Sequence, residues 1–125
     1  MARIFLIDDD HDLPELTKVI LCDKGHAVYI FHEAESALEE IKIKKPDLII
    51  MDMMLPGMSG ADAIREIKNN PKLKDIPVIF LTGLVSARDK ELRETGINVD
   101  GLSYKILGKP YDAAELVALV KDLIN

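Results

Sequence analysis

Five short runs rich in apolar and β-branched residues alternate along this chain with longer segments of helical periodicity. Several of the runs are apolar throughout, whereas a strand with one face in water would alternate apolar and polar residues. They therefore predict strands of a parallel sheet that is covered on both faces. The runs are Ile4–Ile7, Ala27–Phe31, Leu48–Met51, Val78–Leu81 and Ser103–Leu107.

The segments between these runs carry residues that start helices. Three pairs have capping-box spacing, in which an N-cap acceptor is followed three residues later by an acid. They are Asp12 with Glu15, Ser86 with Asp89, and Asp112 with Glu115. Because crossovers between parallel strands are right-handed, the β/α units predict a doubly wound, flavodoxin-like α/β sandwich of three layers. We expect a five-stranded parallel sheet of order 2-1-3-4-5 with five helices.

Composition limits the function of the chain. Its 125 residues fit a single domain, residues 1–125. The net charge of −6 is a poor match to the phosphate backbone of a nucleic acid. Cys22 is the only cysteine, and no apolar run approaches the roughly 20 residues that span a bilayer. We therefore expect a soluble cytoplasmic protein that contacts neither nucleic acid nor membrane directly.

Chemically active side chains follow the predicted strands. Asp8 and Asp9 follow the first run, Asp52 the third, Thr82 the fourth and Lys109 the fifth. In a doubly wound sheet ligands bind at the carboxyl ends of the strands, near the point where the strand order reverses. The first and third strands are neighbours in the expected order, so the three aspartates should converge. Carboxylates held together repel one another unless a cation joins them, and Mg²⁺ prefers such oxygen ligands.

These side chains are the parts that phosphoryl transfer needs. A carboxylate can attack phosphorus and form an aspartyl phosphate, while a metal and hydrogen-bond donors stabilise the charge on the phosphoryl oxygens. Asp52 stands alone at the end of the central strand and is the predicted nucleophile. Asp8 and Asp9 suit metal binding, Lys109 supplies a positive charge, and Thr82 supplies a hydroxyl donor.

Four stretches carry these residues, at ordered positions between Arg3 and the end of the chain. They are IDDD from Ile7, PDLIIMDMMLPGMSG from Pro46, IPVIFLTG from Ile76, and GKPYDAAEL from Gly108. Together they resemble the receiver domain of two-component response regulators, and the resemblance covers the whole chain.

The resemblance implies a role for each residue. Asp52 would be the phosphoacceptor. Asp9 and Asp52 would bind Mg²⁺ directly, with the main-chain carbonyl of Met54, and Asp8 would act largely through water. Thr82 and Lys109 would bind the phosphoryl oxygens. The bond from Lys109 to Pro110 would be cis, which is accessible only before proline.

The resemblance also implies partners. A sensor histidine kinase or a histidine phosphotransfer protein would donate the phosphoryl group. The chain would catalyse its own phosphorylation and dephosphorylation without turning over a substrate, so it would act as a switch and not as an enzyme. The fourth helix, fifth strand and fifth helix usually form the output face in the family. They would bind an output partner that the sequence does not identify, and a homodimer that forms on phosphorylation is a further option.

The chain departs from the receiver pattern in several places. Gly83 stands where the family usually has alanine, and the segment from Gly96 to Pro110 is several residues longer than usual. Ile106 occupies the position of the aromatic switch residue, and Tyr104 lies two residues earlier. Either the fifth strand is shifted and Tyr104 is rerouted, or signalling works without that switch. Lys105 has a more usual spacing from the threonine than Lys109 does, but no proline follows it.

Two further positions bear on the lifetime of an aspartyl phosphate. Residues two after the acceptor and two after the threonine often carry polar side chains that align the attacking water; here they are Met54 and Leu84. Neither side chain can orient water. We therefore predict slow autodephosphorylation.

Other functions fit the residues less well. A haloacid-dehalogenase-like small phosphatase normally has an acid two residues after its nucleophile, where this chain has Met54. A dinucleotide-binding module would carry G-x-G-x-x-G after the first strand, and none is present. A scaffold receiver that is never phosphorylated is a further alternative, and the intact set of acceptor residues argues against it.

Overall fold

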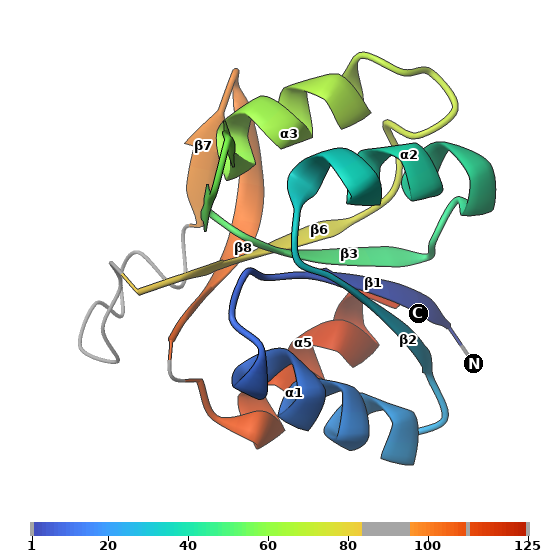
Figure 1. The fold of residues 1–125 in the computed structure, drawn as a ribbon, viewed down its shortest axis with the longest axis vertical. Helices are drawn as coiled ribbons and strands as arrows, with labels where there is room; N and C mark the ends of the chain where they lie inside the picture. The colour runs from blue at the N-terminus through green and yellow to red at the C-terminus, as the bar shows by residue number, and fades with distance from the viewer. Residues whose placement is uncertain (1, 84–95, 110, 125) are drawn as a thin grey trace.

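The computed structural model describes residues 2–83, 96–109 and 111–124, which form a three-layer α/β sandwich (Figure 1). The central sheet has the strand order β2-β1-β3-β6-β8-β7, and β7 is antiparallel to β8. A separate antiparallel ladder joins β4 to β5. The strands are β1 (Arg3–Ile7), β2 (Ala27–Phe31), β3 (Leu48–Asp52), β4 (Met54–Leu55), β5 (Met58–Ser59), β6 (Val78–Thr82), β7 (Ile97–Val99) and β8 (Leu102–Gly108).

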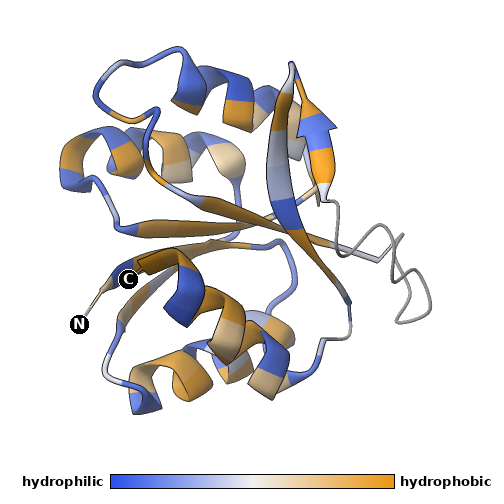
Figure 2. Cartoon of the chain, turned by 180° about the vertical axis from the view of Figure 1, so that it is seen from behind, coloured by the Kyte–Doolittle hydropathy of each residue, from blue (hydrophilic) through white to orange (hydrophobic). Residues whose placement is uncertain are grey.

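Helices cover both faces of the sheet. The described helices are α1 (Asp12–Asp23), α2 (Ala34–Lys44), α3 (Gly60–Lys68) and α5 (Ala113–Ile124). α2 and α3 lie on one face, and α1 and α5 lie on the other (Figures 1 and 2). Strand side chains point alternately to the two faces, so Phe5 and Met51 belong to one core and Leu6 and Ile50 to the other. The two cores hold the layers together.

The predicted fold class is confirmed, and the five predicted strands occur in the predicted order as β2-β1-β3-β6-β8. β3 and β6 are buried at every position, as expected of strands covered on both faces. The predicted fourth helix, with Ser86 and Asp89, falls in residues 84–95 and so lies outside the described residues. No helix in the described ranges is long and apolar enough to cross a membrane.

The two described helix starts that the sequence predicts have different outcomes. Asp112 precedes α5 and accepts a hydrogen bond from the Ala114 N–H at 2.8 Å, as an N-cap does. At α1 the prediction is wrong, because Asp12 is already helical and His11 is the N-cap. The Asp10 carboxylate accepts the Asp12 N–H at 3.0 Å, so an aspartate turn satisfies this donor instead.

The central sheet has a sixth strand, β7, that the sequence did not predict. It forms a hairpin with β8 in which Val99 pairs with Leu102, so the turn consists of Asp100 and Gly101 alone. Both turn residues have positive φ, 53° at Asp100 and 87° at Gly101, as both central residues of a two-residue type I′ hairpin turn do. Arg65 on α3 donates to the Asp100 carboxylate at 2.9 Å. The longer segment before Lys109 thus forms a hairpin of β7 and β8.

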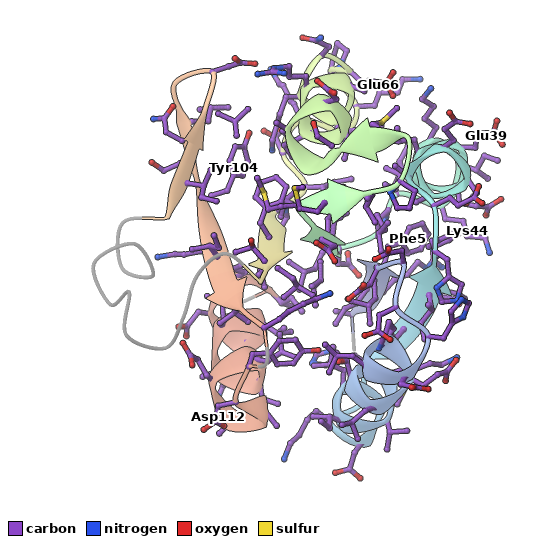
Figure 3. The ribbon with its side chains drawn as sticks, turned by 60° about the vertical axis from the view of Figure 1, so that its left-hand side comes forward. Phe5, Glu39, Lys44, Glu66, Tyr104 and Asp112 are labelled. Atoms are coloured by element: carbon purple, nitrogen blue, oxygen red, sulfur yellow. The ribbon has the colours of Figure 1, made fainter. Side chains whose placement is uncertain are left out.

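Tyr104 lies within this hairpin, on β8, and is buried (Figure 3). Its ring packs edge-on against Phe80 at a centroid distance of 5.5 Å. Ile106, two residues nearer the carboxyl end of the strand, is buried in the same core and pairs with Phe80 in register. The strand therefore carries its aromatic residue one pleat further from the carboxyl edge of the sheet than Ile106.

Candidate functional site

The carboxyl ends of the central strands meet at one edge of the sheet. Asp8 follows β1 and Asp52 ends β3, and Ile7 pairs with Met51 in register. Thr82 ends β6, and its carbonyl accepts the Lys109 N–H at 2.8 Å. Parallel pairing of neighbouring strands thus brings residues far apart in the sequence to the same edge.

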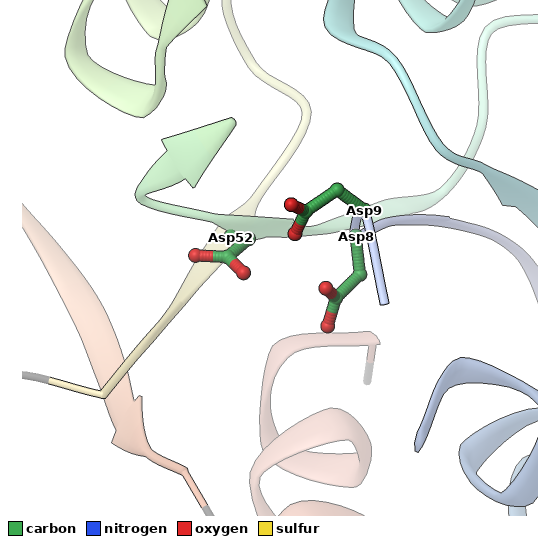
Figure 4. A group of neighbouring side chains, drawn as sticks. All are labelled: Asp8, Asp9 and Asp52. Carbon is green, nitrogen blue, oxygen red and sulfur yellow. The ribbon is translucent and has the colours of Figure 1, made fainter. Parts of the chain in front are cut away.

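The three aspartates form a compact cluster at this edge (Figure 4). One carboxylate oxygen from each of Asp8, Asp9 and Asp52 lies within 4.8 Å of the other two. Asp8 and Asp52 are 1% and 7% exposed, whereas Asp9 is exposed. The cluster is therefore buried at Asp8 and Asp52 and open to solvent at Asp9, which forms its rim.

Each buried carboxylate is held in the same way. Oδ1 of Asp8 accepts the Asp10 N–H at 3.0 Å, and Oδ1 of Asp52 accepts the Met54 N–H at 3.0 Å. These hydrogen bonds to the backbone two residues further on fix the side chains to their own turns. The second oxygen of each carboxylate pairs with Lys109, whose Nζ lies 2.6 Å from Asp8 Oδ2 and 2.8 Å from Asp52 Oδ2.

The pairing with Lys109 is reflected in the pKa values of the site. Burial raises the pKa of Asp8, and the Asp52 carboxylate raises it further, while hydrogen bonds from Lys109 and the Asp10 N–H oppose the rise without cancelling it. Burial lowers the pKa of Lys109, but its hydrogen bonds to Asp52 and Asp8 outweigh this effect and raise the pKa above its usual value. The lysine thus remains an ammonium ion at neutral pH.

A glycine that the sequence argument did not single out sets the path of the chain after Asp52. The Gly60 N–H donates to the Met53 carbonyl at 2.9 Å as α3 begins. A Cβ at this position would lie 3.0 Å from Met53 Cα and 3.3 Å from the Asp52 carbonyl oxygen. A side chain here would require these neighbours to move, so glycine suits the start of α3 this close to the strand end that carries the aspartate.

The other sequence-predicted residues are placed as follows. Thr82 is buried beside the cluster, and the Met54 side chain is 67% exposed while its backbone N–H holds Asp52. Lys105 is exposed in the middle of β8, opposite Ile79, so it is not at the carboxyl edge where Lys109 lies. Pro110 and Leu84 are outside the described residues, and so are the predictions made for them.

His32, which directly follows β2, contacts the backbone of the site. His32 Nδ1 lies 2.9 Å from the Asp8 carbonyl oxygen, and its ring packs on that of His11 at a centroid distance of 4.2 Å. His32 thus connects the end of β2 to the turn that carries the acidic residues. No short motif marks the histidine pair, because the two histidines are distant in the sequence.

Known proteins resemble this chain in sequence or in structure. Regulatory protein VanR of Enterococcus faecium is 34% identical over 119 residues, which are 95% of this chain and 48% of that protein, so the chain spans about half the length of this relative. The solved signal receiver domain of a signal transduction histidine kinase from Syntrophus aciditrophicus has a TM-score of 0.82 at 29% identity, covering 99% of this chain and 90% of that one. A response regulator from Desulfuromonas acetoxidans gives 0.79 at 27%, covering 99% and 97%.

The family model of the response regulator receiver domain matches residues 4–121, which include each of the strand ends described above. Taken with the fold and the relatives, this match shows that the chain belongs to the response regulator receiver family.

Proposed function

We propose that Asp52 of this chain accepts a phosphoryl group from the phosphohistidine of a histidine kinase or a histidine phosphotransfer protein. One observation carries the proposal. The Asp52 carboxylate is held at the end of β3 by the Met54 N–H, next to two further carboxylates and the Lys109 ammonium. Such a fixed nucleophile, surrounded by groups that bind phosphate and its metal, is what aspartyl phosphorylation needs.

The residues of the cluster fit Mg²⁺. Three carboxylates converge, and the single ammonium of Lys109 offsets only part of their charge. All the converging ligands are oxygens, the type that Mg²⁺ prefers, and the exposed rim at Asp9 gives an ion access from solvent. We assign direct binding to Asp9, Asp52 and the Met54 carbonyl, and binding through water to Asp8. When bound, the ion neutralises charge on the phosphoryl oxygens.

The chain's own groups perform the transfer. An Asp52 oxygen forms a bond to phosphorus as the bond from phosphorus to the donor nitrogen breaks, and the leaving imidazole takes up a proton. Lys109 exchanges a carboxylate contact for a phosphoryl oxygen, and the Thr82 hydroxyl donates to another. The product stays attached to the protein, so the chain acts as a switch that catalyses its own modification.

The alternatives lack this support. A haloacid-dehalogenase-like phosphatase needs an acid two residues after the nucleophile, and Met54 at that position is an exposed thioether. A dinucleotide-binding module needs glycines after the first strand, where this chain has Asp8 and Asp9. A scaffold receiver has no need for three converging carboxylates and a lysine held between two of them.

We extend the proposal to the organisation and location of the chain. Residues 1–125 form one receiver domain, and this domain signals in the cytoplasm. Phosphorylation would draw Lys109 toward the phosphoryl group, and Lys109 directly follows β8 and precedes α5. The output face would therefore include β8 and α5 together with the predicted fourth helix. An output partner, or a second copy of the chain, that binds the phosphorylated state better would shift the population toward that state.

The test is incubation of the chain with Mg²⁺ and a small acyl phosphate, followed by intact-mass measurement. A single phosphoryl adduct in the wild type and in Asp122→Asn, which changes an exposed helix residue, but not in Asp52→Asn supports the proposal. Steady release of phosphate from several esters indicates a phosphatase instead. An unmodified wild type indicates a scaffold.

A further inference from the structure

Four polar or charged residues are buried among the described residues, and three of them belong to the site: Asp8, Asp52 and Thr82. The fourth is Thr17, in the second turn of α1, and it is 1% exposed. A buried hydroxyl needs hydrogen-bond partners. Thr17 has two: the Leu13 carbonyl, to which it donates at 2.9 Å, and the phenol oxygen of Tyr111.

The direction of the second hydrogen bond follows from the first. Thr17 has one hydroxyl hydrogen, and the Leu13 carbonyl can only accept it, so the Tyr111 phenol donates to the Thr17 oxygen. Burial raises the pKa of Tyr111 above its usual value. The phenol thus keeps its proton at neutral pH and is available as a donor.

This contact joins two of the chain segments that form the acidic site, the one that begins α1 and the one that follows β8. Thr17 lies on α1, which begins directly after the turn of Asp8 and Asp10. Tyr111 lies two residues after Lys109 and packs against the core under α1 and α5. Lys109 is itself held on its other side by the hydrogen bond from its N–H to the Thr82 carbonyl. The Lys109 backbone thus has a hydrogen bond of its own, and two residues further on Tyr111 contacts α1.

We propose that Tyr111 and Thr17 are positioning residues whose hydrogen bond anchors the segment after β8 on α1 and so sets where the Lys109 ammonium lies between Asp8 and Asp52. Lysine has a long flexible stem, so its ammonium is placed only as well as its backbone is held. A loosened segment would lower the fraction of molecules whose lysine can reach a phosphoryl oxygen. This inference rests on the proposed function of Asp52.

The first experiment measures the phosphorylation rate at saturating Mg²⁺ over a series of phosphoramidate concentrations. Loss of one hydrogen bond predicts a maximal rate about three- to tenfold lower in Tyr111→Phe and in Thr17→Val. Half-saturation by the donor should stay unchanged, because Lys109 acts on the phosphoryl group during transfer. Thr17→Ser keeps the hydroxyl and should keep the rate. Tyr29→Phe, which removes a phenol from the edge strand β2, should match the wild type.

Combining the variants tests whether the two residues act as one unit. Tyr111→Phe with Thr17→Val should be no slower than the slower single variant, since both remove the same contact. Maximal rates within twofold of the wild type in both single variants, losses that multiply in the double variant, or a Thr17→Ser variant as slow as Thr17→Val would each overturn the proposal.

A second readout does not depend on phosphorylation. The ¹H–¹⁵N resonance of the Lys109 ammonium is recorded in the unphosphorylated chain and assigned by its loss in Lys109→Met. It should shift or broaden in Tyr111→Phe and Thr17→Val but not in Tyr29→Phe. An unchanged resonance in the first two variants overturns the positioning role. If phosphoramidate does not modify the wild type, but the Lys109 resonance changes in Tyr111→Phe and Thr17→Val as expected, the function of Asp52 is refuted and the positioning of Lys109 still stands.

Discussion

The Lys109 ammonium lies 2.6 Å from Oδ2 of Asp8, a carboxylate whose side chain is 1% exposed. The same nitrogen is 2.8 Å from Oδ2 of Asp52. One cation is thus shared by two buried acids, and without it their mutual repulsion and their lost hydration would go uncompensated. Lys109 therefore has a structural role that precedes its proposed role toward a phosphoryl group.

Lys109→Met should destabilise the fold, because it keeps most of the stem but leaves the two carboxylates without their partner. The free energy of unfolding should fall by roughly 3 kcal/mol, the low end for breaking a buried pair, since Lys109 is partly exposed. Urea denaturation in Mg²⁺-free buffer measures the change. Lys105→Met, at an exposed position in β8, serves as the control and should change stability by less than about 0.5 kcal/mol. Equal losses in the two variants would contradict the structural role.

Mg²⁺ should stabilise the fold, because an ion bound only by the folded chain shifts the unfolding equilibrium. A concentration one hundred times the dissociation constant should add about 2.7 kcal/mol to the free energy of unfolding. Asp9→Asn removes the exposed ligand and should abolish most of this gain, while relieving some repulsion when no metal is present. Thermal unfolding with Mg²⁺ and with a chelator measures both effects. A full response to Mg²⁺ in Asp9→Asn would remove Asp9 from the ligand set.

Stability should depend on pH through Asp8. Its pKa is raised in the folded chain above the usual 3.8, chiefly by burial, so the folded state holds the Asp8 proton to higher pH than the unfolded state does. The stabilisation from this group is present below about pH 3.8 and is lost as the pH rises through the folded-state pKa. The wild type should therefore lose stability relative to Asp8→Asn between pH 4 and neutral pH. Urea denaturation of both proteins across that range tests the sign, and the opposite trend would contradict the raised pKa.

The site could be predicted largely because it depends on a simple rule of topology. Asp8, Asp52 and Lys109 each follow an apolar run, and parallel strands carry such residues to one edge of the sheet. The contacts that hold them could not be predicted in the same way. The bond between Thr17 and Tyr111 and the close approach of Gly60 to Met53 join distant segments or depend on the packing of a helix against a strand end.

The hairpin shows a different limit. Asp100 and Gly101, between Val99 and Leu102, are the residues of a two-residue hairpin turn, so the signal was present in the sequence. The strand before it has only three residues, and such a short run is hard to distinguish from a loop. The position of Tyr104 then follows from the pairing of β8 with β6, in which Gly108 lies opposite Thr82. That register is a tertiary property that local patterns do not determine.

Met54→Asn should speed the loss of the phosphoryl group. The Met54 side chain is 67% exposed beside Asp52 and has no group that orients water, whereas an asparagine amide can donate to and accept from a water molecule. An acceleration of about three- to tenfold corresponds to one such hydrogen bond. The decay of the phosphorylated protein, followed by intact mass after removal of the donor, gives the rate. Leu102→Asn replaces another exposed apolar side chain, on the hairpin, and should leave the decay unchanged. A Met54→Asn variant that decays no faster than the wild type would rule out this cause of slow hydrolysis.

Gly60→Ala should damage both the fold and the site. Its Cβ would lie 3.0 Å from Met53 Cα and 3.1 Å from Phe80 Cε1, and a backbone atom and a fully buried ring can yield little. Overpacking of this kind costs about 1–3 kcal/mol. Movement of Met53 would also displace Asp52, so the phosphorylation rate should fall, and urea denaturation and intact-mass kinetics measure the two losses. Gly83→Ala is the control, because its added Cβ meets no atom of the described residues beyond its chain neighbours within 4 Å, and it should leave stability unchanged or raise it slightly. A Gly60→Ala protein as stable and as fast as Gly83→Ala would show that α3 does not need this close approach to hold the acceptor strand end.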